Sequence, residues 1–207
     1  MRPTRQRLGA GLALALLVAA CVDRSAPAPD CAFDYDQIKA DEMSDLAKGD
    51  IVVGRFVRQE ATIDTLFDHE RADFERYQAI LASRERPVDP LDLAILDGAL
   101  ARLADEELWD RQDDRDCDEG DGTFSLYCAL YYASVDYLGR YEHRRTVMQE
   151  VRFAIEDVSD GRAFEHRLMD FNNLPDTSLA DVREVLGMAR DRVATRLAAQ
   201  DECEIEY

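Results

Sequence analysis

The fold is decided by residues 124–141, which have the sequence FSLYCALYYASVDYLGRY. Asp136 is the only charged residue between Phe124 and Gly139, so this helix-length stretch is apolar on nearly every side. A helix with that pattern belongs in the interior of a protein, and we expect it to be the central helix of the fold. Gly139 is expected to kink or break it.

Apolar residues at three- and four-residue spacing predict amphipathic helices around this stretch. The predicted helices span residues 62–83, 91–109, 146–158, 161–171 and 178–200. Ser178, followed by Asp181, is the expected N-cap of the last helix. The segment 49–57 (GDIVVGRFV) is the one candidate strand, but it is short and unpaired, so we interpret it as a loop entering a helix. The predicted fold is all-α, an irregular bundle of about six helices stapled by disulfides.

The composition is strongly acidic, with 44 Asp and Glu against 25 Lys and Arg and a net charge of −19 over 207 residues. This length suits a single domain with a proper core, and a hydrophobic content of 46% excludes wholesale disorder. Nucleic acid is not an expected partner, because a polyanion gains affinity by exchanging counterions for Lys and Arg. Direct adsorption to anionic lipid is disfavoured for the same reason.

The N-terminal segment has the pattern of an export signal. Three arginines within residues 1–7 precede an unbroken apolar run, residues 8–20, which is too short to span a bilayer comfortably. The run ends in Val-Ala-Ala-Cys at residues 18–21, and this sequence resembles the lipobox of bacterial lipoproteins.

The resemblance implies cleavage before Cys21, a lipid on its sulfur, and attachment to a bacterial envelope membrane with the protein facing the periplasm. Val22 rather than Asp follows the cysteine, which favours the outer membrane. The predicted division is a signal peptide (residues 1–20), a lipid anchor with a Pro-containing flexible tether (21–30), and a single helical domain (31–207). An ordinary secreted protein cut slightly downstream is the alternative interpretation.

The four remaining cysteines are Cys31, Cys117, Cys128 and Cys203. An even number in an oxidising compartment predicts two disulfides, and four cysteines allow three pairings. We favour Cys117–Cys128 as a local pair and Cys31–Cys203 as a tie between the ends of the domain, with the other pairings left open. A zinc site ranks below disulfides, because the CxxC spacing of structural zinc is absent from the sequence.

The three histidines, His69, His143 and His166, each follow an aromatic residue and an acid, and each has an Arg within two residues. Such groups can serve as metal ligands or as general acids and bases. A helix-boundary histidine flanked by exposed charges is the favoured interpretation, because no two lie within one helical turn. The sequence also lacks a GxSxG nucleophile motif and a glycine-rich phosphate loop. We therefore predict no catalytic residue, no metal site and no cofactor.

The acidic segment 113–122 (DDRDCDEGDG) contains Cys117, and Cys117 and Cys128 bracket its Gly-containing second half. Its alternating aspartates imitate the start of an EF-hand loop, but Glu119 stands where the turn glycine belongs and Ser125 where the bidentate Glu belongs. A solvated acidic loop closed by a disulfide is the favoured interpretation. The candidate contacts for a basic partner are Asp116, Asp118, Glu119 and Asp121.

A second polar segment, residues 166–173 (HRLMDFNN), combines several hydrogen-bonding side chains in a short span. Such groups cap helix ends and fix the following turn. We expect this structural role for them.

The functional hypothesis from sequence is a periplasm-facing lipoprotein that acts as an acidic protein-binding module. Electrostatic complementarity would speed its encounter with a cationic protein, and an immunity or inhibitor protein against a secreted toxin or cell-wall hydrolase is one concrete version. A structural or assembly lipoprotein of the envelope is the first alternative. A metal-dependent enzyme that uses the His and carboxylate clusters is the second. The membrane is contacted only through the lipid anchor, and the sequence carries no signal for an oligomeric state.

Overall fold

A computed structural model describes residues 35–118 and 122–204, with the side chains of residues 37–118 and 122–201. These ranges contain seven α-helices and no strand, so the all-α prediction is confirmed for them. The helices are α1 (Tyr35–Val57), α2 (Asp68–Ala82), α3 (Pro90–Arg102), α4 (Leu126–Leu138), α5 (Thr146–Val158), α6 (Arg167–Asn172) and α7 (Leu179–Glu204). Two short 3-10 turns, η1 (Ile63–Thr65) and η2 (Glu106–Leu108), lie in the connections.

Helix α4 is the interior helix that the apolar stretch predicts. Leu126, Leu130 and Ala133 on it are fully buried. Ser125 caps its N-terminus by accepting a hydrogen bond from the Cys128 N–H at 3.1 Å. Gly139 ends it in the left-handed conformation at φ 73°, which only glycine adopts without strain. The break predicted at Gly139 is therefore confirmed.

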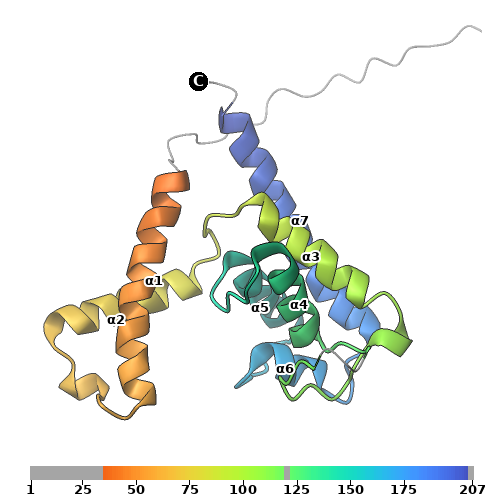
Figure 1. Ribbon diagram of the computed structural model, residues 1–207, viewed down its shortest axis with the longest axis horizontal. Coiled ribbons are helices and arrows are strands. Elements are labelled where there is room, and N and C mark those ends of the chain that lie inside the picture. Colours follow the sequence, from red (N-terminus) through yellow and green to blue (C-terminus); the bar gives the residue numbers. More distant parts are fainter. Residues whose placement is uncertain (1–34, 119–121, 205–207) are drawn as a thin grey trace, which may run out of the picture.

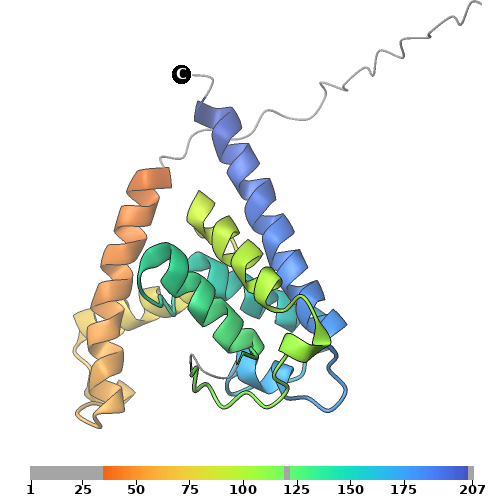
Figure 2. The same cartoon turned by 45° about the vertical axis from the view of Figure 1, so that its right-hand side comes forward.

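The main core forms where α3, α4, α5 and α7 meet. Helix α3 packs against α4 and α7, and α5 packs against α7 and the short α6 (Figures 1 and 2). The long α7 supplies a continuous buried stripe to this core: Val182, Val185, Leu186, Ala189 and Val193. Its N-terminus is capped as predicted, because Ser178 and Asp181 exchange hydrogen bonds through backbone and side-chain atoms.

Helices α1 and α2 form a separate helical arm beside this bundle (Figure 1). The arm has its own small apolar cluster, built on Val52, Ala61 and Leu66. At Gly49 the two helices approach so closely that a Cβ atom would overlap the Tyr77 side chain. The loop predicted for residues 49–57 is therefore wrong: the segment is helical, and Gly49 permits the crossing of the two helices.

Charged contacts join the arm to the bundle. The buried Arg86 donates to the Glu42 carboxylate on α1, with its Nε at 2.8 Å. Arg144, which follows α4, lies 2.7 Å from the Asp50 carboxylate and donates to the Tyr77 hydroxyl. The apolar clusters of the arm and of the bundle are distinct, so ion pairs carry much of this attachment.

Three predicted helices begin late or end early. Residues 62–83 hold the η1 turn before α2, because the Thr62 N–H donates to the Thr65 hydroxyl at 2.8 Å and closes a local turn. The helix predicted to reach Trp109 ends at Arg102, and the one expected from Gly161 begins at Arg167. None of the helices in the described ranges is long and apolar enough to cross a membrane.

The predicted local disulfide, Cys117–Cys128, is present, with 5.4 Å between the two Cα atoms. Cys31 and the lipobox cysteine, Cys21, lie outside the described residues, and the side chain of Cys203 lies outside the described side chains. The Cys31–Cys203 pairing, the signal peptide and the tether therefore stay predictions.

A single buried amide, that of Asn172 at the end of α6, holds three segments together. Its Oδ1 accepts hydrogen bonds from the Trp109 indole N–H at 2.9 Å and from the Leu126 backbone N–H at 3.0 Å. Its Nδ2 donates to the Asp110 carbonyl at 2.9 Å. Asn172 is fully buried, so water cannot take the place of its amide as the hydrogen-bond partner of these three groups.

Substituting Asn172→Leu is expected to lower the free energy of unfolding by at least about 2 kcal/mol, because it leaves two buried N–H donors without an acceptor. Urea unfolding followed by circular dichroism measures this change. The exposed Gln112→Leu is the matched control and should stay within about 0.5 kcal/mol of the wild type. Equal stability of the two variants would contradict the role given to Asn172.

Candidate functional site

A cavity of about 690 Å³ lies between the end of α2 in the arm and the part of the bundle that contains α5 and α6. We call it the basic pocket, because four arginines line it: Arg84, Arg115, Arg152 and Arg167. They come from four separate segments: the α2–α3 connection, the disulfide loop, α5 and α6. Two carboxylates, those of Glu156 and Glu165, also line it, so arginines outnumber acids in a chain that is acidic overall.

Two of the four arginines already have carboxylate partners. Arg84 pairs with Glu156 at 3.2 Å and with Asp157 at 3.1 Å. Arg167 lies 3.9 Å from Glu156. Among the described residues, the guanidinium groups of Arg115 and Arg152 have no carboxylate oxygen within 4.0 Å. The pocket therefore holds two guanidinium groups that form no direct ion pair with a described carboxylate.

Arg152 is joined to His143 rather than to an acid. Its guanidinium donates to the His143 carbonyl at 3.1 Å and lies 3.3 Å from the ring Nδ1. A guanidinium has no acceptor atom, so Nδ1 is the accepting nitrogen and the proton of the neutral ring is on Nε2. Burial and the neighbouring Arg167 lower the pKa of Arg152, yet an arginine side chain stays charged in proteins.

His143 is uncharged at neutral pH. Desolvation by the surrounding protein and the guanidinium groups of Arg152, Arg144 and Arg115 lower its pKa to about 4. Each of these effects disfavours a second positive charge at the pocket wall. The ring therefore lines the pocket in its neutral form.

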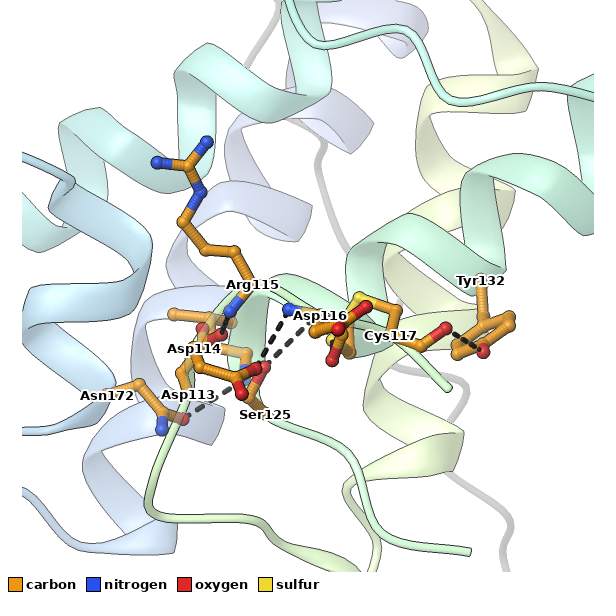
Figure 3. The surroundings of a disulfide bond; sticks show 10 residues. Asp113, Asp114, Arg115, Asp116, Cys117, Ser125, Tyr132 and Asn172 are labelled. Carbon is orange, nitrogen blue, oxygen red and sulfur yellow. Dashed lines mark hydrogen bonds between the residues drawn. A yellow bond between two sulfur atoms is a disulfide. The ribbon is translucent and has the colours of Figure 1, made fainter. Parts of the chain in front are cut away.

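Arg115 reaches the pocket from the disulfide loop (Figure 3). Its backbone N–H donates to the Asp113 carboxylate at 2.8 Å, and the Asp116 N–H donates to the Asp114 carboxylate at 2.9 Å. Burial raises the pKa of Asp113. The Tyr132 hydroxyl donates to the Cys117 carbonyl at 2.7 Å, so the loop is held on both sides of Arg115.

The structure brings two of the three histidines together. His143 and His166 line the basic pocket, whereas His69 lies on the arm, where its ring stacks on Phe67 at 5.9 Å. His166 also lies beside the capping contact of α6, because its backbone N–H donates to the Asp170 carboxylate at 2.8 Å. The capping role predicted for residues 166–173 is therefore observed at Asp170 and Asn172.

The acidic loop lies next to the pocket. Asp114 and Asp116 share a shallow hollow with Arg115 and His166, and both aspartates are exposed, as is Asp118. Glu119 and Asp121, two of the contacts predicted for a basic partner, lie outside the described residues. Within the described ranges, no three His, Cys, Asp or Glu side chains are placed to hold a metal ion.

Sequence reasoning did not find the arginines of this site. Three of them carried a local signal: Arg115 is the only base in an acidic run, Arg167 follows His166 directly, and Arg152 lies on a strongly amphipathic helix. These local signals do not reveal that the four arginines line one pocket, because the residues are spread over positions 84 to 167 of the sequence.

Comparison with protein families matches residues 87–192, just over half of the chain, to a family of unknown function, DUF6197. The chain belongs to this family. Comparisons with curated proteins and with solved structures found no match. The DUF6197 region runs from the start of α3 into α7 and contains Arg115, Arg152 and Arg167. Arg84 and the arm lie outside it, so the arm adds one wall to a pocket built mainly by the DUF6197 region.

The low pKa of His143 predicts a pH dependence of stability. The ring has a pKa of about 4 when folded against 6.5 as a free group, so the unfolded chain binds a proton first as the pH falls. Stability should therefore decrease through this group between pH 6.5 and about 4.

Urea unfolding at about pH 7 and about pH 5 tests this on the wild type and on His143→Gln. The wild type should lose more stability than the variant on acidification. An NMR titration of the ring gives the pKa directly, and a value near 6.5 would contradict the environment described for His143.

Proposed function

We propose that this protein binds a small anionic ligand in the basic pocket. The observation that carries the proposal is the pair of guanidinium groups, on Arg115 and Arg152, that line a cavity of about 690 Å³ and have no described carboxylate oxygen within 4.0 Å. Guanidinium N–H groups form strong, directional hydrogen bonds to carboxylates and phosphates. A bound anion would supply the balancing charge that the described residues do not.

The net negative charge of the whole protein does not prevent an anion from binding in the pocket. Salt screens exposed charges beyond about 8–10 Å under physiological conditions, so the arginines nearest to a ligand dominate its binding. Distant carboxylates reduce the rate at which an anion arrives more than they weaken its final contacts.

The pocket also has apolar walls. Leu81 from the arm, Phe164 and Leu168 line it together with Phe153, whose ring has the Arg84 guanidinium 4.6 Å from its centre. Sites for small molecules commonly combine apolar walls with a few converging polar groups. An anion with an aromatic or aliphatic portion therefore fits this lining better than a bare inorganic ion.

The location of this activity is part of the proposal. The lipobox resemblance supports a lipid-anchored protein of the bacterial envelope that faces the periplasm. The Cys117–Cys128 disulfide is consistent with that setting, since disulfides persist in oxidising compartments. We propose a binding role for the pocket, because its lining offers four guanidinium groups that can hold an anion.

Phenyl phosphate is a suitable probe, and we expect it to bind with a Kd of about 1 mM or lower in isothermal titration calorimetry at fixed ionic strength. Arg152→Gln should weaken binding by about tenfold or more, because it removes a charged donor. Phenol and phenyltrimethylammonium provide neutral and cationic comparisons of similar shape.

Arg190→Gln is the matched control, because Arg190 lies on α7, pairs with Asp97 at 2.6 Å and does not line the pocket. It should leave the affinity for phenyl phosphate unchanged. Binding of phenyltrimethylammonium as tightly as phenyl phosphate, or equal losses in the two arginine variants, would refute an anion site in this pocket.

A second candidate function is the capture of a cationic protein by the acidic loop, as expected from sequence. It is supported by the exposure of Asp114, Asp116 and Asp118 on a loop that the disulfide and Asn173 hold in place. An immunity or inhibitor protein remains one version of this proposal. The two functions involve different surfaces and can be tested separately.

For this candidate we expect one basic protein from envelope or secreted extracts to be retained in stoichiometric amount at low salt and released at moderate salt. The double variant Asp116→Lys with Asp118→Lys should abolish retention. Asp64→Lys with Glu85→Lys, which changes two exposed acids elsewhere by the same charge, should retain the partner. Retention by the loop variant, measured by quantitative mass spectrometry, would eliminate this candidate.

A further inference from the structure

Arg115 has a backbone conformation that arginine rarely adopts. Its φ is 67°, in the left-handed region that costs a non-glycine residue free energy because of contacts of its Cβ. Such a conformation persists only where the surrounding structure imposes it, and an observed outlier of this kind is a reason to look for function. Arg115 is also one of the two pocket arginines whose guanidinium has no carboxylate oxygen within 4.0 Å among the described residues.

Three constraints impose this conformation. On the N-terminal side, the Asp113 carboxylate accepts the Arg115 N–H. The backbone of Asp113 is itself held by Asn173, which accepts the Asp113 N–H at 2.8 Å and donates to the Asp113 carbonyl at 2.7 Å. On the C-terminal side, Cys117 is bonded to Cys128 on α4. The loop is therefore fixed to α6 before Arg115 and to α4 after it.

These constraints direct the Arg115 side chain away from the disulfide (Figure 3) and into the pocket, near His143. Without the disulfide, the loop would keep its contact with Asn173 but lose its attachment on the other side. A long, exposed arginine would then sample many orientations.

We propose that the Cys117–Cys128 disulfide and Asn173 are positioning groups for the anion site, which hold Arg115 where it contacts the ligand. This inference rests on the proposed anion-binding function, and it assigns the disulfide a role in affinity that a purely structural cross-link would not have. The recognised chemistry is that of a carboxylate or phosphate on a small molecule.

The first test needs no ligand. In the full chain, Arg115→Gln should raise the pKa of His143, since Arg115 is one of the cations that lower it. The double variant Cys117→Ala with Cys128→Ala should raise it in the same direction and by no more than Arg115→Gln does. In the triple variant the pKa of His143 should equal that in Arg115→Gln, because removal of the disulfide has no further effect once the Arg115 guanidinium is absent. NMR titration of the His143 ring, assigned with His143→Gln, measures all four proteins.

The second test uses phenyl phosphate and calorimetry. Arg115→Gln and the double cysteine variant should each weaken binding by about tenfold, and the triple variant should be no weaker than Arg115→Gln. Asn173→Ala, at an exposed position that threatens the fold less, should weaken binding in the same direction. Gln112→Leu, at an exposed position that precedes this loop and does not line the pocket, is the control and should bind as the wild type does.

The two tests separate the proposals. Failure of the wild type to bind phenyl phosphate overturns the proposed function, while the NMR titration still decides whether the disulfide positions Arg115. A wild-type pKa of His143 in both the double cysteine variant and Asn173→Ala overturns the positioning role. So does a triple variant whose pKa rises beyond that of Arg115→Gln, because that result shows a general loosening of the fold.

Discussion

The amide of Asn172 is the interaction on which the arrangement of the pocket depends. It joins the end of α6 to the start of α4 and to the loop that begins at Trp109. Because the amide lies in a fully buried position, its partners cannot exchange it for water, and the three segments keep one relative placement. The next residue, Asn173, extends the same junction to the backbone of Asp113. The walls that carry Arg115 and Arg167 therefore share one buried polar anchor.

The distribution of charge explains how an acidic protein can present a basic site. Most arginines of the described chain are neutralised by an adjacent acid, as Arg190 is by Asp97 and Arg196 by Glu150. Arg152 instead contacts a histidine and a carbonyl group. Its charge is not paired with an acid, and it adds to the effect of burial in lowering the pKa of His143. The distinctive feature of the pocket is that two of its four guanidinium groups have no carboxylate oxygen within 4.0 Å among the described residues, in a chain with no excess of bases.

The fold could be predicted from the sequence where a single residue decides the local structure. Gly139 ends α4, Ser178 with Asp181 starts α7, and the residues 146–158 form a helix with the predicted bounds. Residues 49–57 were not predictable in this way, because their helix depends on a contact between Gly49 and a residue 28 positions later, Tyr77. The pocket was hidden for the same reason, since spacing along the chain defines helix faces and does not show which faces converge.

Arg84 links the arm to the proposed ligand site. Its ion pairs with Glu156 and Asp157 fasten the end of the arm to α5, and the same guanidinium covers the Phe153 ring in the pocket wall. The attachment of the arm elsewhere also relies on charge, through Arg86 with Glu42 and through Arg144. Salt weakens exposed ion pairs far more than buried ones. Ionic strength therefore has two effects on the pocket. Salt screens the attraction between an anion and the arginines, and it loosens the Arg84 contacts that complete the pocket wall. The buried Arg86–Glu42 pair meanwhile keeps the arm in place.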